Sequence, residues 1–388
     1  MSGSYKTDML GALPKLVRSL FPPKKTLAEV LKRDANNFDL IRLLAAIAVI
    51  YGHSFSLIKN VYGTDLVHAV TGIYSGEWAL KTFFFLSGLL VVNSAISGKG
   101  AVAYSLHRLF RIMPALIFVV LSSAYVIGPL CTNLTIAEYF NQSATYAYVK
   151  HMLTFQGWGT QSLGYYDLPG VFADNLFKGN VNAPLWSLAV EVFAYILILA
   201  FSLVGAFNPK VAGLIFLVFM LDTFLPGRLI FFWLPKNSSD FSAIPFCFAL
   251  GGFMAVYKEK FSITAFVPVG FFLLCFLFRG WTHTIYLVYT TIFMLVIYLA
   301  SLPLVINLPK FPDLSYGTYL WGWPIQQMIA SKFPEIEFYP FFLSSLFFSL
   351  VMAYVSWRFI ESKAIETGRK SIKYIHRNFA TPTSGILK

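Results

Sequence analysis

Charged residues are scarce in this chain of 388 residues. Only 12% are Asp, Glu, Lys or Arg, whereas 57% are hydrophobic and 18% are aromatic. Soluble globular domains carry about 25% charged and about 45–50% apolar residues. The composition therefore excludes an ordinary soluble enzyme and indicates a fold whose solvent is largely lipid.

Cysteine is also rare, and the short motifs of several enzyme classes are missing. Cys131, Cys247 and Cys275 stand singly, without the paired spacing of a zinc site or a disulfide framework. The sequence has no HExxH, GxSxG, Gly-rich phosphate loop or DHHC cluster. It gives no support to a metalloprotease, a serine hydrolase, an NTPase or a palmitoyltransferase. We expect no metal site and no permanently bound cofactor.

What the chain does have is a series of long apolar runs. A bilayer-spanning helix needs about 20 predominantly apolar residues. The runs predict an all-α integral membrane protein, a bundle of about ten transmembrane helices. They lie at roughly 38–58, 77–97, 112–128, 184–206, 211–225, 241–257, 262–278, 283–306, 314–331 and 339–358.

The positive charges predict the orientation of this bundle. The net charge is +12, but Lys and Arg collect in the two tails and in short loops, so we expect no nucleic-acid partner. With the N-terminus in the cytosol, 21 basic residues fall inside and eight at the outer side, as the positive-inside rule requires. We therefore expect both termini in the cytosol: a basic tail at 1–37, a transmembrane domain at 38–360 with an external loop at about 129–183, and a basic tail at 361–388.

Two ionisable residues in the first span lie on one helix face. Arg42 and His53 are eleven positions apart, which in an α-helix is about 16 Å of rise and a net rotation of about 20°. An ionisable group in a membrane helix marks a site or pathway by default. The alternatives are that Arg42 snorkels to lipid headgroups and that His53 only hydrogen-bonds a neighbouring helix.

A carboxylate occurs at a similar predicted depth in the fourth span. Glu191 is flanked by Ser187 and Tyr195 at i−4 and i+4, so one helix face carries three polar groups. A carboxylate beside an imidazole can orient it for acid and base catalysis. Glu191 and His53 are therefore predicted to pair, although a purely structural ion pair has the same pattern.

A pair of arginines precedes the third span. Arg108 and Arg111, at i and i+3 in HRLFRIMP, could bind a phosphate-bearing ligand at the cytosolic surface. Positive-inside flanking explains the pair equally well. In the second span, the small residues Ser87 and Gly88 favour close helix packing.

Five stretches together resemble the acyltransferase 3 family of bacterial membrane acyltransferases. They are FDLIRLLAAIAVIYGHS (38–54), with its Arg-x10-His pattern, GEWALKTFFFLSGLLV (76–91), HRLFRIMP (107–114), APLWSLAVEVFAYI (183–196) and LSYGTYLWGWPIQQ (314–327). In the last stretch many relatives have His where this chain has Gly322, so that position receives no catalytic role. The chain resembles the stand-alone type, without a fused hydrolase-like domain.

The resemblance implies a bacterial inner-membrane O-acyltransferase that moves an acyl group, most often acetyl, from cytosolic acyl-CoA to a hydroxyl of a surface or exported glycan such as O-antigen, capsule or exopolysaccharide. Arg42, Arg108 and Arg111 would hold the acyl-CoA. His53 would be the general base or a transient acyl carrier, with Glu191 orienting it.

Aromatic residues of the outer half are candidates for binding the glycan acceptor. Trp186, Tyr319, Trp321 and Trp323 could stack on sugar rings, with Ser187 and Tyr195 in support. An aromatic belt at the membrane interface would account for the same residues.

Two other functions remain open at this point. A multi-span transporter of a lipid-linked glycan or an anion would use the polar residues to line a conduit; it would favour inverted repeats and broken helices, and neither is evident. A noncatalytic component of a polysaccharide assembly complex is the other alternative.

Overall fold

Helices are the main secondary structure of the described chain. The computed structural model describes residues 20–59, 65–97, 100–156, 166–225, 228–230, 241 and 243–379. In these ranges, the strands are β1 (Lys25–Thr26) and β2 (Ser262–Ile263), which pair antiparallel. The all-α class is thus confirmed apart from this two-residue ribbon.

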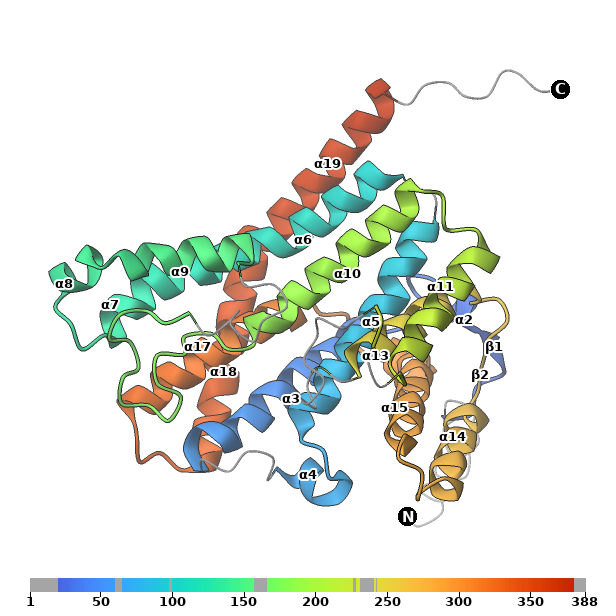
Figure 1. Cartoon of the computed structure of the whole chain (residues 1–388), viewed down its shortest axis with the longest axis horizontal. Helices are drawn as coiled ribbons and strands as arrows, with labels where there is room; N and C mark the ends of the chain where they lie inside the picture. Colours follow the sequence, from blue (N-terminus) through green and yellow to red (C-terminus); the bar gives the residue numbers. More distant parts are fainter. Residues whose placement is uncertain are drawn as a thin grey trace, which may run out of the picture.

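A helix occupies every segment in which a span was predicted (Figure 1). These helices are α3 (Phe38–Lys59), α5 (Ser75–Ile96), α6 (Ala101–Ser122), α10 (Leu185–Leu203), α11 (Pro209–Asp222), α13 (Ile244–Val256), α14 (Phe266–Leu277), α15 (Thr284–Ala300), α17 (Ser315–Lys332) and α18 (Phe338–Ser356). Short helices α4 (Leu66–Thr71) and α16 (Pro303–Ile306) lie in connections.

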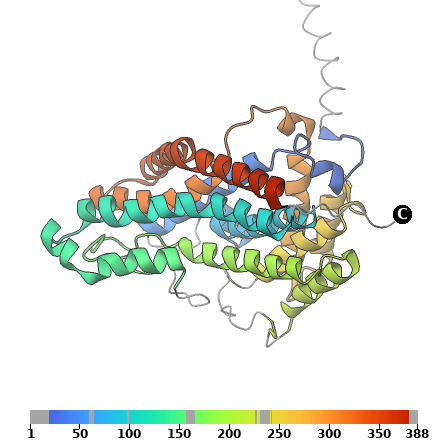
Figure 2. The same ribbon diagram turned by 90° about the horizontal axis from the view of Figure 1, so that it is seen from above.

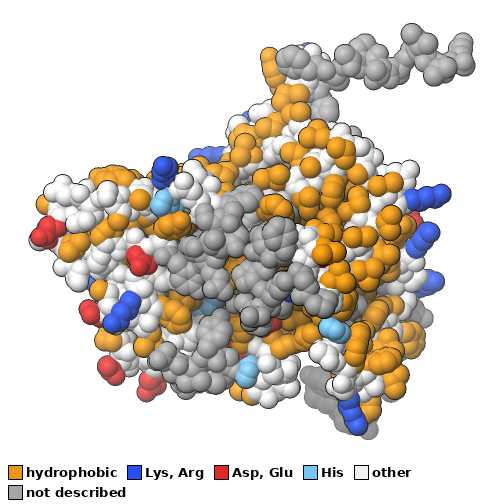
Figure 3. Space-filling model, in the orientation of Figure 1, with side chains coloured by type: hydrophobic (Ala, Val, Ile, Leu, Met, Phe, Trp, Pro, Cys, Tyr) orange, Lys and Arg blue, Asp and Glu red, His pale blue; other side chains and the backbone are white. Residues whose placement is uncertain are grey.

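Five helical stretches in the described ranges are long and apolar enough to cross a membrane. They run over Phe38–Ile58, Ser75–Ile96, Ala101–Cys131, Leu185–Leu203 and Phe338–Ile375. Apolar side chains cover the face of the molecule over α10 and α11, where Ile196, Leu214 and Leu221 are exposed (Figure 3). Such a surface suits lipid. The protein is therefore a membrane protein, while the count of ten spans and the placement of the termini stay predictions.

The predicted external loop folds back on the bundle. It contains α7 (Gly128–Cys131), α8 (Ile136–Asn141) and α9 (Ser143–Thr154), and α7 is joined to α6 by the π-helical turn η1 (Ser123–Ile127). Tyr139, Tyr148 and Phe172 of this loop are buried in a hydrophobic cluster shared with α6 and α17. The loop thereby covers one end of these helices.

Both predicted tails contain segments that pack on the bundle. Helix α2 (Leu27–Val30) begins at a capping box between Thr26 and Glu29, and its Leu27 and Val30 are fully buried. At the other end, the π-helical turn η2 (Trp357–Glu361) leads from α18 into α19 (Ser362–Phe379), which runs beside α6 (Figure 2). Residues 1–19 and 380–388 of the predicted tails lie outside the described ranges.

Helices α5 and α13 approach so closely that glycine is required at their contact. A Cβ added at Gly88 would lie 2.1 Å from the carbonyl oxygen of Phe248, and one at Gly251 would lie 2.2 Å from that of Phe85. The prediction that Gly88 permits close packing is confirmed. This contact fixes α5, which carries Ser87 of the site described below.

The close approach predicts that Gly88→Ala destabilises the protein. Overpacking typically costs about 1–3 kcal/mol, so the midpoint of thermal unfolding in detergent should fall. The matched control is Gly270→Ala in α14, where an added Cβ meets nothing within 4 Å. Equal midpoints for the Gly88 variant and the wild type would contradict this packing.

Candidate active site

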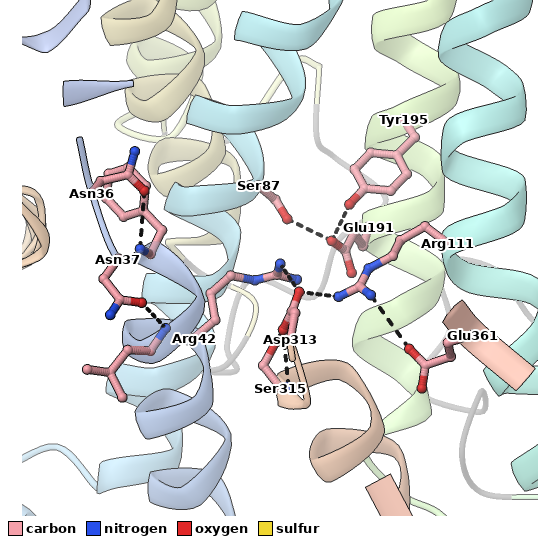
Figure 4. Close-up of polar contacts among 12 residues, drawn as sticks. Asn36, Asn37, Arg42, Ser87, Arg111, Glu191, Tyr195, Asp313, Ser315 and Glu361 are labelled. Carbon is pink, nitrogen blue, oxygen red and sulfur yellow. Dashed lines mark hydrogen bonds and ion pairs between the residues drawn. The ribbon is translucent and has the colours of Figure 1, made fainter. Parts of the chain in front are cut away.

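One carboxylate joins two of the arginines singled out in the sequence. Asp313, two residues before α17, accepts a hydrogen bond from Nη1 of Arg42 on α3 at 3.0 Å and a second from Nη2 of Arg111 on α6 (Figure 4). The backbone N–H of Ser315 donates to the other carboxylate oxygen at 3.2 Å. Asp313 thus ties three helices together at one point.

The two guanidinium groups keep Asp313 ionised. Burial alone would raise the pKa of this carboxyl, but the charges of Arg42 and Arg111 outweigh burial and lower the pKa to about 2. Because this pKa lies below its ordinary value, the ionised carboxylate stabilises the fold above about pH 4, and that stabilisation is lost as the pH falls toward 2. The cluster is therefore charged at every physiological pH.

Arg111 has a second acidic partner at the far side. Its Nη1 lies 3.6 Å from Glu361, which is 1% exposed and accepts a hydrogen bond from Ser356 at 2.9 Å. Glu361 belongs to η2, and π-helical turns are frequent at functional sites. The arginine therefore connects α6 with the turn that leads into α19.

Glu191 lies in the same polar cluster and not beside the histidine. Its carboxylate accepts hydrogen bonds from Ser87 of α5 at 2.7 Å and from the hydroxyl of Tyr195 (Figure 4). The guanidinium of Arg108 lies 5.5 Å from the centre of the Tyr195 ring, a cation–π distance. Nε of Arg108 is buried without a hydrogen-bond partner in the described part of the chain.

A small cavity of about 40 Å³ opens among these groups. Its lining includes the cation of Arg42, the carboxylate of Glu191 and the hydroxyls of Ser and Tyr residues, among them Ser87 and Ser187. We call this space the arginine cavity.

His53 lines a second cavity of about 100 Å³, here called the histidine cavity. Its ring is nearly perpendicular to that of Trp323, with 4.9 Å between the ring centres. Trp186 and Asn180 line the same space. Three of the aromatic residues proposed to bind the acceptor, Trp186, Tyr319 and Trp323, therefore line the same cavity as His53.

The two cavities share a wall. Leu80 and Tyr319 line both of them. The hydroxyl of Tyr319 lies 2.6 Å from Oγ of Ser187 and donates to the carbonyl of Pro184 at 2.9 Å. Arg42 and His53 thus stand on one side of α3, as their spacing predicts, and open into two spaces that share Leu80 and Tyr319 as a wall.

The predicted contact between Glu191 and His53 is absent from this structure. The two residues line different cavities, and hydrogen bonds from Ser87 and Tyr195 hold the carboxylate in the arginine cavity. Similar depth along two helices does not make side chains meet, because Tyr319 lies between the cavities.

Trp321 also lies away from His53. Its ring packs against Phe118 with 5.3 Å between ring centres and lines an apolar cavity of about 400 Å³ between α6, α17 and α18. Trp321 and Trp323 are two positions apart and project from different sides of α17.

Two acidic residues of the site were missed by the sequence reasoning. Asp313 precedes the LSYGTYLWGW stretch and Glu361 follows the last apolar run, so both are read as boundary charges. Asp313 could have been identified by its position, because an acidic residue at the predicted cytosolic edge lies where Arg42, Arg108 and Arg111 were expected to gather. In the described ranges, no group of three or more His, Cys, Asp or Glu is placed to hold a metal ion.

The fold and this buried polar centre define a membrane-embedded protein with an internal reaction or binding site. Comparison with known proteins makes the class specific: residues 36–358 match the acyltransferase domain of the acyltransferase 3 family, and the chain belongs to this family. It is therefore an acyltransferase-family membrane protein.

Two curated relatives are informative. The O-acetyl transferase of Shigella phage Sf6 is 24% identical over 340 residues, which cover 85% of this chain and 96% of that protein. Nodulation protein 10 of Rhizobium leguminosarum bv. viciae is 33% identical over 87 residues, 21% of this chain and 22% of that protein. No solved structure gives a significant match.

The shared carboxylate predicts that Asp313→Asn destabilises the protein. Removing one partner of a buried ion pair costs about 3–5 kcal/mol, and since Asp313 is 17% exposed we expect the lower end of this range. Thermal unfolding of purified variants in detergent measures it.

The matched control is Asp34→Asn. Asp34 pairs with Lys310 at 2.8 Å, but its side chain is 85% exposed, so its loss should change stability little. Equal stability of the two variants would show that Asp313 does not hold the cluster together.

Proposed function

We propose that this protein is an O-acyltransferase that moves an acyl group, in the first instance acetyl, from cytosolic acyl-CoA to a hydroxyl of a surface or exported glycan. One observation carries the proposal: in a member of this family, the arginine cavity and the histidine cavity share the Tyr319 wall. The match to an O-acetyl transferase over 85% of the chain supports acetyl as the group.

The arginines suit the donor's phosphates. Arg42, Arg108 and Arg111 come from two helices and converge on the cytosolic side of the proposed topology. Guanidinium groups bind phosphate by paired, charge-assisted hydrogen bonds. Arg108 has a free buried Nε, whereas Arg42 and Arg111 are held by Asp313. Donor phosphate would therefore meet guanidinium groups that carboxylates already hold in place, with Arg108 supplying an unused N–H.

His53 suits the transfer step. In the proposed reaction it removes the proton from the acceptor hydroxyl as the oxygen attacks the thioester carbon; the carbon–sulfur bond breaks, and the coenzyme A thiolate leaves and takes up a proton. Transient acylation of His53 is the other route. The hydroxyls of Tyr319 and Ser187, 2.6 Å apart at the wall, could stabilise the oxyanion formed.

Glu191 takes a different role from the one its depth suggested. It lies in the arginine cavity with Arg42, and its hydrogen bonds fix Ser87 and Tyr195. In our proposal, Glu191 positions the ring of Tyr195, which the guanidinium of Arg108 contacts. It does not stabilise the protonated form of His53. In our proposal, the protein acts in the bacterial inner membrane, with both termini in the cytosol.

Replacing His53 tests the reaction centre. His53→Ala should lower the rate of acetyl transfer by at least about 100-fold, because general base catalysis contributes about 10²–10⁴-fold. The measurement is the O-acetyl content of surface polysaccharide from cells producing equal amounts of each variant in the membrane. His68→Ala, on α4 away from both cavities, is the control and should keep the wild-type level. Wild-type acetylation by the His53 variant would exclude this centre.

Replacing Arg108 tests the donor site. Arg108→Gln should raise the KM for acetyl-CoA by about tenfold, since a hydrogen bond to a charged group contributes about 1.5–3 kcal/mol. The difference between variant and wild type should shrink as salt is added, because salt screens the phosphate attraction. Arg369→Gln on the exposed surface of α19 is the control for general positive charge. An unchanged KM for acetyl-CoA in the Arg108 variant at low salt would contradict a role in donor binding. Arg108 would then only help to set the orientation of the protein in the membrane.

A further inference from the structure

One face of α5 runs past both cavities. Gly76 and Leu80 line the histidine cavity, whereas Leu80, Phe84 and Ser87 line the arginine cavity. The intervals of four, four and three residues between these positions are those of a single helix face. Because Leu80 lines both cavities, an acyl group that moves from one to the other along this face passes Leu80.

Tyr319 forms the other part of the shared wall, and contacts fix both its ring and its hydroxyl. The hydroxyl donates to the carbonyl of Pro184 at 2.9 Å and lies 2.6 Å from Oγ of Ser187. The ring packs against Phe83 with 6.0 Å between ring centres. These contacts oppose any rotation of Tyr319 that would widen the passage beside Leu80.

Leu80 is itself held in place. The residue is 7% exposed and belongs to the largest hydrophobic cluster of the described chain. Its helix is fixed against α13 by the close approach of Gly88 to the Phe248 carbonyl. The space at the wall therefore depends on the size of the Leu80 side chain.

The cavities on the two sides of the wall are small. Their volumes are about 40 Å³ on the arginine side and about 100 Å³ on the histidine side. The apolar cavity beside Trp321, at about 400 Å³, is several times larger but does not include Leu80. The space beside the wall thus suits a short acyl group and not a long fatty-acyl chain.

We propose that Leu80 is a specificity-determining residue that limits the transferred group to acetyl, because a longer acyl chain meets its side chain at the shared wall. This inference rests on the proposed O-acyltransferase function. The transfer is unchanged: the acceptor oxygen forms the ester bond and gives its proton to His53, while the thioester carbon–sulfur bond breaks and coenzyme A leaves as the thiolate. Leu80 contributes no chemistry to this step and selects the donor by size.

The test measures donor selectivity of the purified full-length protein in detergent. The acceptor is surface polysaccharide of the host strain, stripped of its esters by mild alkali, and the measured quantity is the ratio of kcat/KM for acetyl-CoA to that for propionyl-CoA. Leu80→Ala removes most of the side chain and should lower this ratio about tenfold, since one methylene in an apolar pocket changes selectivity by about 10–200-fold. Wild-type protein that uses both donors equally well would contradict the proposal.

Leu89→Ala is the matched control on the same helix. Leu89 lies nine positions after Leu80, which turns it about 180° to the opposite face of α5. It is fully buried and lines neither cavity. Its replacement should lower the unfolding midpoint and leave the donor ratio at the wild-type value.

A donor ratio that stays at the wild-type value in Leu80→Ala, or that falls equally in Leu89→Ala, would overturn the inference. If Leu80→Ala does not fold, the smaller change Leu80→Val decides: a lowered ratio supports the inference and an unchanged ratio contradicts it. Absence of transfer by the wild-type protein from either donor would instead refute the proposed function.

Discussion

The carboxylate of Asp313 between Arg42 and Arg111 is the interaction on which the site depends. Two part-buried cations from α3 and α6 would repel each other if no carboxylate lay between them. Asp313 neutralises part of that charge and joins α17 to both helices. Glu361 extends the link to η2 and α19. The site is therefore preassembled by charge pairing before any ligand arrives.

This constraint divides the interior into two chemical regions. Arg42 and Glu191 line the arginine cavity, whereas an imidazole and two tryptophans line the histidine cavity. Leu80 and Tyr319 line both cavities. In the proposed reaction, the donor's thioester crosses this shared wall to reach His53, while the charged part of the donor stays on the arginine side.

The sequence predicted the helices well because apolar length is a local property. All ten runs coincide with helices, and the Arg42 to His53 spacing correctly placed both residues on one side of α3. The partner of a charge is not local. Asp313 lies more than 200 positions from Arg111, so no spacing rule connects them.

Two further differences have the same physical origin. The similar depth of Glu191 and His53 along their helices suggested a contact between them. Depth does not determine the direction in which each side chain projects from its helix, and Tyr319 lies between the two cavities. Charge composition marks 1–37 and 361–388 as basic tails, but it does not show that Leu27 and Val30 of α2 are buried or that Gly368 of α19 packs close to Phe110 of α6.

In the proposed reaction, an acyl group passes from the arginine side to the histidine side within one protein. The test supplies radiolabelled acetyl-CoA to one face only of membrane vesicles that contain the protein and the polysaccharide. Labelled polysaccharide is expected when the donor is at the face of Arg108 and Arg111, with the label accumulating at the opposite face. Equal labelling from either face, or label that stays on the donor's side, would contradict it.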